Sequence, residues 1–119
     1  MPLPEDREAR LRCFRNALRN WSYRGYVRFK PIAEEWLLTA FPEYSVHQIA
    51  GELYHYVEKG GEIDEQKELR PEFKHFEYHY DLRVRIGTRK IYFESILKIQ
   101  KDPNDPDDPS IIVVSAHDV

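Results

Sequence analysis

The chain has little of several features that readily assign a protein to a class. Its 119 residues include one cysteine, Cys13, so neither an intramolecular disulfide nor a cysteine-based zinc cluster can form. No apolar run approaches the ~20 residues that cross a bilayer, and the first residues lack the apolar segment of a secretory signal. Glycine-rich phosphate loops, GxSxG and HExxH motifs are also missing. The sequence therefore predicts a cytoplasmic protein with no membrane contact, no metal and no cofactor.

The composition is that of one globular domain covering residues 1–119. Hydrophobic residues make up 41% of the chain and aromatic residues 13%, which excludes a disordered protein. A chain of this length buries roughly two-thirds of its unfolded surface and so forms a single core. We find no internal repeat and no interdomain linker.

The charge is unevenly distributed along the chain. The net charge is -3, but residues 1–30 carry eight basic and three acidic residues, a net +5, which leaves -8 for the remainder. The basic residues of this segment are Arg7, Arg10, Arg12, Arg15, Arg19, Arg24, Arg28 and Lys30. A basic N-terminal helix within residues 1–20 would suit nucleic acid phosphates or an acidic partner, or would be only a solvated helix face.

Three segments carry the features of helices, at residues 5–20, 31–41 and 45–59. The first has an apolar stripe, the second begins at a proline, and the third opens with the capping-box pair Ser45 and Gln48. The residues expected to be buried include Leu11, Phe14, Leu18, Ile32, Ala33, Trp36, Leu37, Ile49, Leu53 and Trp21. A short strand is expected within residues 23–29.

The second half of the chain has the period of strands. Apolar and charged side chains alternate over residues 75–86, which is typical of a strand. Gly87-Thr88 suits a type II′ turn, and residues 89–100 are expected to form the returning strand. This register places Val84 opposite Ile91 and puts the apolar side chains of both strands on one face of the sheet. We expect residues 62–68 to form a polar edge strand and residues 111–114 to form a strand buried on both faces. We predict an α+β fold: an antiparallel sheet of three to five strands with two or three helices on one face.

The other face of this predicted sheet collects the groups that metal-free RNA cleavage needs. A base must take the 2′-hydroxyl proton, an acid must protonate the leaving oxygen, and cations must hold the phosphate. The candidate acid–base residues are Tyr92, His117, Glu94 and His79. The candidate phosphate-binding residues are Arg83, Arg85, Lys90 and Lys98. An exposed sheet face that is merely solvated would show the same alternation.

The predicted register also opposes like charges, Asp81 to Glu94 and Arg85 to Lys90, at a small cost in stability. A diagonal pair between Arg83 and Glu94 would relieve this repulsion. A metal site using Glu77 and His79 is a weaker alternative, because neighbouring strand residues would need further ligands from elsewhere. The aspartate-rich segment 102–108 lacks the glycine and glutamate of a calcium loop and is expected to be a solvated connection.

The layout of residues 25–119 resembles the RelE/MqsR-like superfamily of small bacterial ribonuclease toxins. The resemblance lies in a short strand, two helices and terminal antiparallel strands, with local likeness at residues 80–94 and 111–117. It implies a metal-independent endoribonuclease that acts on RNA or ribosome-associated mRNA and is neutralised by an antitoxin. By position, Tyr92 matches a catalytic tyrosine, and Arg83 and Lys98 match phosphate-binding residues. The acidic net charge departs from these commonly basic toxins.

The sequence therefore leaves two functions open. One is a toxin-like endoribonuclease in which His117 or Glu94 is the base and Tyr92 or His79 the acid. The other is a non-catalytic protein-interaction module of the same fold.

Overall fold

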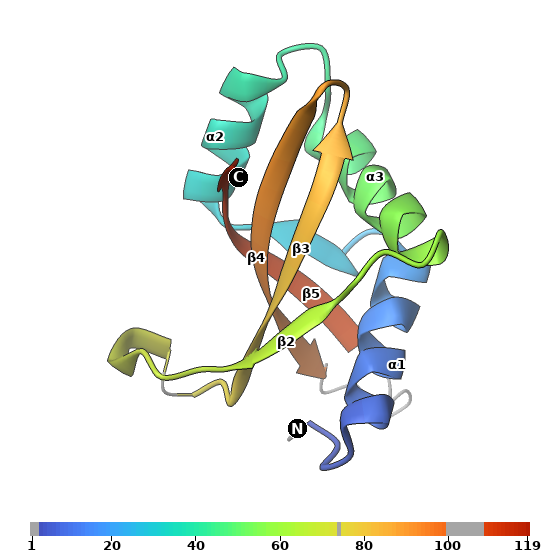
Figure 1. Ribbon diagram of the computed structural model, residues 1–119, viewed down its shortest axis with the longest axis vertical. Helices are drawn as coiled ribbons and strands as arrows, with labels where there is room; N and C mark the ends of the chain where they lie inside the picture. The colour runs from blue at the N-terminus through green and yellow to red at the C-terminus, as the bar shows by residue number, and fades with distance from the viewer. Residues whose placement is uncertain (1–2, 74, 100–108) are drawn as a thin grey trace.

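The fold is α+β, as the sequence predicted, and in the part of the chain that the structure describes three helices pack on one face of a five-stranded sheet (Figure 1). The computed structural model describes residues 3–73, 75–99 and 109–119. The helices are α1 (Arg7–Arg19), α2 (Pro31–Ala40) and α3 (Val46–Glu58), with a short 3₁₀ turn, η1 (Pro71–Phe73). The strands are β1 (Val27–Phe29), β2 (Asp64–Lys67), β3 (Tyr78–Ile86), β4 (Arg89–Ile99) and β5 (Pro109–Asp118). The expected connection at 102–108 lies outside the described residues.

The sheet has the strand order β1-β5-β4-β3-β2, and its neighbouring strands are antiparallel except at one edge. There β1 pairs with β5 in parallel, Arg28 opposite Ile112. The antiparallel prediction is therefore wrong for this pair. No hairpin fixes its direction, because α2, α3 and three strands separate β1 from β5 in the chain.

The β3–β4 hairpin has the register that the sequence predicted. Val84 lies opposite Ile91, Arg83 opposite Tyr92 and Ile86 opposite Arg89. Gly87 has a φ of 62°, and Thr88 has no positive φ, which is the pattern of a type II′ turn. The two-residue turn therefore determines which side chains share each face of the sheet.

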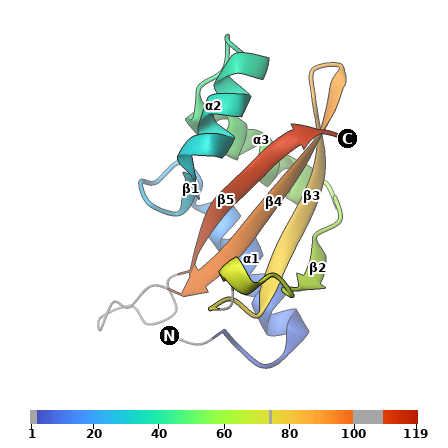
Figure 2. The same ribbon diagram turned by 90° about the vertical axis from the view of Figure 1, so that its left-hand side faces the viewer.

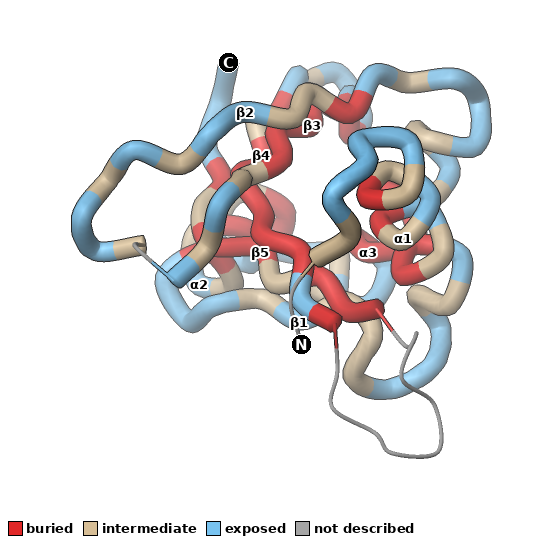
Figure 3. The backbone as a smooth tube through the Cα atoms, turned by 90° about the horizontal axis from the view of Figure 1, so that it is seen from below, coloured by how far each residue is buried: buried red, intermediate tan, exposed pale blue. Residues whose placement is uncertain are grey.

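The core lies between the apolar face of the sheet and the three helices (Figure 3). Its largest fully buried side chains include Phe14, Leu18, Leu37, Ile49, Leu53, Tyr80, Leu82, Phe93 and Leu97. The prediction that Ile32 is buried is wrong, since this side chain is 72% exposed. Trp21 and Trp36, expected in the core, are only half-buried. Trp36 packs against the core, whereas Trp21 packs against α3 at Gly51 and His47. The spacing of apolar residues therefore predicted where the helices lie, but not which residues at the edge of each apolar face are buried.

One arginine of the basic N-terminal segment is buried. Arg10 of α1 donates from Nε and Nη2 to the two carboxylate oxygens of Glu65 on β2, at 2.8 and 2.9 Å. Tyr80 on β3 donates to the same carboxylate at 2.7 Å. The exposed basic face of α1 is therefore made by Arg7, Arg12, Arg15 and Arg19, without Arg10.

The predicted capping box begins α3. Ser45 Oγ accepts from the Gln48 backbone N–H at 3.1 Å, and Gln48 Oε1 accepts from the Ser45 N–H at 2.8 Å. Replacing Ser45 with alanine should lower the free energy of unfolding by about 1 kcal/mol, because it leaves an N-terminal amide without its side-chain acceptor. Urea denaturation measures this loss. The exposed loop variant Ser22→Ala is the control, and equal stability of the two variants would contradict the role of the cap.

Candidate functional site

The candidate site lies on the face of the sheet opposite the helices, where β3, β4 and β5 run side by side. Arg83, Tyr92 and His117 form one row across these strands, because the register opposes Tyr92 to both neighbours. Asp81 and Glu94 form the next row. Five residues from three strands are thereby brought together, and four of them were predicted as site residues from the sequence.

Tyr92 is the centre of this group. Its hydroxyl donates to Asp81 Oδ1 at 2.6 Å, its ring centroid lies 4.7 Å from that of His117, and the Arg83 guanidinium lies 5.5 Å from it. Burial and the hydrogen bond to the Asp81 carboxylate raise the pKa of Tyr92 well above its usual value. The phenol therefore keeps its proton at neutral pH and is held at a fixed point.

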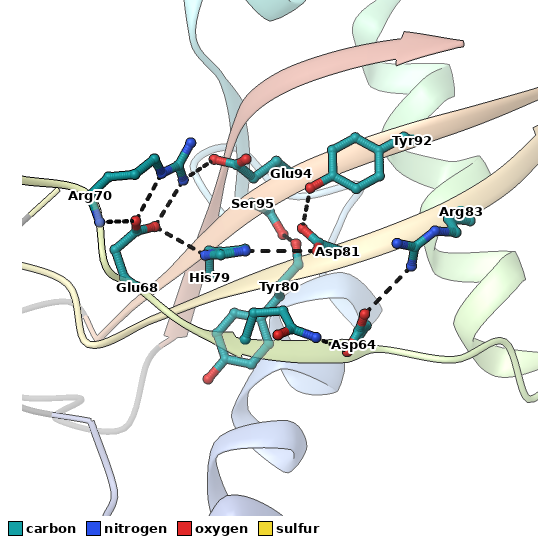
Figure 4. Close-up of polar contacts among 11 residues, drawn as sticks. Asp64, Glu68, Arg70, His79, Tyr80, Asp81, Arg83, Tyr92, Glu94 and Ser95 are labelled. Atoms are coloured by element: carbon teal, nitrogen blue, oxygen red, sulfur yellow. Dashed lines mark hydrogen bonds and ion pairs between the residues drawn. The ribbon is translucent and has the colours of Figure 1, made fainter. Parts of the chain in front are cut away.

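The connection between β2 and β3 brings a second group onto this face (Figure 4). Arg70 donates from Nε to Glu68 at 2.8 Å and from Nη2 to Glu94 at 2.5 Å. His79 Nδ1 lies 3.0 Å from Glu68, and its Nε2 lies 3.7 Å from Asp81 Oδ2. A chain of polar contacts thus runs from Arg70 through His79 to Asp81, which also binds Tyr92.

Glu68 and Arg70 are functional candidates that sequence reasoning missed. Glu68 ends the predicted edge strand 62–68 but lies just beyond β2, and Arg70 follows in the irregular segment before Pro71, where no period assigns a side chain to a face. Only the crossing of this segment over the sheet shows that Arg70 contacts Glu94. The presence of Arg70 before a proline was visible, but nothing in the spacing linked it to β4.

The predicted diagonal pair does not neutralise the opposed carboxylates of Asp81 and Glu94. Glu94 accepts from Arg70, while Arg83 lies 3.6 Å from Asp64 on β2, so the prediction of an Arg83–Glu94 pair is wrong. Burial raises the pKa of Asp81, an effect opposed by the Tyr92 hydroxyl and His79. Of the two carboxylates, Glu94 is therefore already occupied by a guanidinium, which leaves it poorly suited to take a proton from a substrate.

The two candidate histidines do not share one site. His117 lies beside Tyr92, whereas His79 lies two residues before Asp81 on β3, which is two strands from β5. With ~3.4 Å per residue along a strand and ~4.8 Å between strands, the two histidines are on the order of 15 Å apart. They cannot flank one phosphate. His117 belongs with Tyr92, and His79 lies between Glu68 and Asp81.

The predicted phosphate-binding residues divide into two places. Arg83, Arg85 and Lys90 are exposed and occupy the hairpin end of the face, with Arg85 opposite Lys90. Lys98 lies six residues from Tyr92 along β4, or ~20 Å, opposite Ser110. Three of the four cations therefore lie close to Tyr92, and Lys98 does not.

The metal alternative finds no ligand set in the part of the chain that the structure describes. No three His, Cys, Asp or Glu side chains there are arranged to hold a metal ion. Glu77 is exposed, and the ring of His79 faces Glu68 and Asp81 instead. Within the same residues, no helix is long and apolar enough to cross a membrane.

The acidic side of the site should make folding sensitive to low pH. Hydrogen bonds from Arg70 hold the pKa of Glu68 at about 2, below its ordinary value of 4.5. A lowered pKa stabilises the folded state above pH 4.5, and this stability is lost as the pH falls toward 2.

We expect Arg70→Gln to remove part of this dependence. The difference in unfolding midpoint between wild type and Arg70→Gln should be largest near pH 6 and shrink between pH 4.5 and 2. Thermal unfolding across this range measures it, and the exposed variant Arg85→Gln is the control. A difference independent of pH would contradict the Arg70–Glu68 coupling.

Comparisons of the chain with protein-family models, curated proteins and solved structures found no match.

Proposed function

We propose that this protein is a metal-independent endoribonuclease whose active site is the row Arg83, Tyr92 and His117. The observation that supports this most directly is the packing of a phenol between an imidazole and a guanidinium on an open sheet face. Imidazole is the side chain that exchanges protons near neutral pH, and a guanidinium binds phosphate oxygens in pairs. The resemblance of residues 80–94 and 111–117 to RelE/MqsR-like toxins points to the same activity.

In the proposed reaction, the imidazole of His117 takes the proton of a ribose 2′-hydroxyl. The 2′-oxygen then forms a bond to its own phosphorus, and the bond from phosphorus to the 5′-oxygen breaks. The Tyr92 hydroxyl, which donates to Asp81 in the free protein, turns to the 5′-oxygen and gives it its proton, and protonated His117 returns a proton to the phenolate. The products are a 2′,3′-cyclic phosphate and a free 5′-hydroxyl, so protons and bonds balance without a metal.

Other side chains of the face support this step. Arg83, with its side chain 44% exposed, binds the phosphate and stabilises its developing charge. Asp81 accepts a hydrogen bond from the Tyr92 hydroxyl, and His79 Nε2 lies 3.7 Å from Asp81. Glu94 is not the base in this scheme, since Arg70 already binds its carboxylate. Arg85 and Lys90 extend the cationic surface toward the hairpin turn.

The activity is tested by incubating the purified protein with total RNA and with purified ribosomes carrying mRNA, in excess EDTA. We expect internal cuts whose fragments carry 2′,3′-cyclic phosphate ends. Loss of all cleavage in EDTA with recovery on adding Mg²⁺ would contradict the metal-independent reaction. Intact RNA under every condition would remove the proposal.

The exposed basic face of α1 favours a second function, a protein-interaction module in which that face binds an acidic partner such as an antitoxin. Expression in a bacterium separates the two. We expect growth arrest by the wild-type protein and normal growth with His117→Ala if the chain is a ribonuclease. Normal growth with both proteins would favour the interaction module.

A further inference from the structure

A second surface of the molecule has the chemistry of a nucleic-acid site. A cleft of about 480 Å³ lies between the loop after α1, the edge strand β1 and the beginning of α3. Figure 2 shows that this loop projects beyond β1, at the edge of the sheet. The lining side chains that matter here are Trp21, Tyr23, Arg24, Arg28, Phe29 and His47.

The cleft combines aromatic faces with fixed positive charge. Tyr23 is 66% exposed, and Arg24 and Arg28 are exposed beside it. No aspartate or glutamate lines this cleft among the described residues, whereas a neighbouring one that shares Trp21 is lined by Glu43 and Glu52. In a protein with a net charge of -3, this local pattern selects an anionic ligand that also has a flat ring.

Trp21 packs the inner part of the aromatic wall against α3. The Trp21 ring lies 4.9 Å from that of His47, and it packs so closely on α3 that a Cβ at Gly51 would come within 3.0 Å of it. Tyr23 lies 6.5 Å from Tyr26, edge to face. The cleft therefore has a packed inner aromatic, Trp21, and an exposed outer one, Tyr23, whose ring face is open to a base.

We propose that this cleft binds single-stranded RNA, with a base stacked on Tyr23 and the adjoining phosphates held by Arg24 and Arg28. The inference rests on the proposed function, since it supplies a second contact for the same substrate. The cleft and the Tyr92 site are separate. β1 pairs with β5 at Val27 and Ile111, six residues or ~20 Å from His117 along the strand. A bound strand must therefore span several nucleotides to occupy both.

Binding is measured with a fluorescein-labelled 12-nucleotide single-stranded RNA and the Tyr92→Phe variant, so that cleavage does not consume the probe. Tyr23→Ala should weaken binding roughly 5- to 150-fold, the usual effect of removing one stacking ring. Tyr23→Phe keeps the ring and should bind normally. Arg24→Gln with Arg28→Gln should weaken binding and reduce its dependence on salt, whereas the α1 pair Arg12→Gln with Arg15→Gln should change it less.

Three further probes identify the ligand. Duplex RNA of the same sequence should bind more weakly than the single strand, because its bases are already stacked. A 12-residue polyaspartate should compete poorly, and so should AMP. Equal competition by polyaspartate would show that charge alone is recognised and would overturn the inference. Equal binding of AMP would make the cleft a mononucleotide site and would also overturn it.

The outcomes separate this inference from the proposed function. Unchanged RNA binding in folded Tyr23→Ala and Arg24→Gln/Arg28→Gln variants would overturn RNA binding by the cleft. It would not contradict the proposed cleavage. If the wild-type protein binds RNA through the cleft but does not cleave it, the proposed ribonuclease activity is overturned and RNA binding by the cleft is supported.

Discussion

Replacing Tyr92 with phenylalanine is expected to slow RNA cleavage roughly 100- to 10,000-fold, the usual contribution of a general acid. The variant keeps the ring between Arg83 and His117 and removes only the hydroxyl that would protonate the 5′-oxygen. Single-turnover cleavage of a labelled RNA in EDTA measures the rate. His117→Ala should cause a loss of the same order, because it removes the proposed base.

Two controls separate chemistry from folding. Tyr92→Phe leaves the buried Asp81 carboxylate without its hydroxyl donor, so its thermal midpoint should also fall. His117 is exposed, and His117→Ala should unfold close to wild type. Tyr54→Phe removes a phenolic hydroxyl from α3 and should cleave at the wild-type rate. Cleavage at full rate by both Tyr92→Phe and His117→Ala would exclude this row as the active site.

Replacing Arg10 with methionine is expected to lower the free energy of unfolding by about 3–5 kcal/mol, as when one partner of a buried ion pair is removed. The Arg10 and Glu65 side chains are only 7% and 5% exposed. Burial alone would raise the pKa of Glu65, but hydrogen bonds from Arg10 and Tyr80 outweigh it and hold the pKa below its usual value. Without Arg10, a buried carboxylate is left charged between α1 and the sheet.

A double variant tests this cause. Glu65→Gln in the Arg10→Met background removes the buried charge and keeps a side-chain oxygen that accepts from Tyr80. We expect it to recover part of the lost stability in urea denaturation. The exposed variant Arg12→Met, on the same helix, should change stability by less than about 0.5 kcal/mol. If the double variant is less stable than Arg10→Met alone, unpaired charge is not the cause of the loss.

Local signals in the sequence predicted much of the fold because each acts within a few residues. The capping box at Ser45 and Gln48, Pro31 at the start of α2 and the Gly87-Thr88 turn all lie where they were expected. The turn mattered most for the site. It opposes Arg83 to Tyr92 and Asp81 to Glu94 through a two-residue connection, so pairing on the outer face followed from counting along the chain.

Alternation along β3 and β4, together with the two-residue turn between them, determined that Tyr92, Arg83, Asp81 and Glu94 share one face of the sheet. Tertiary structure decided the partners. The segment from Glu68 to Arg70 crosses that face and occupies Glu94, and β5 runs antiparallel to β4 and delivers His117 to Tyr92. The packing of α1 against the sheet also places Arg10 against Glu65. These contacts join residues distant in the chain, and they depend on how the elements pack in three dimensions, which no short-range period encodes.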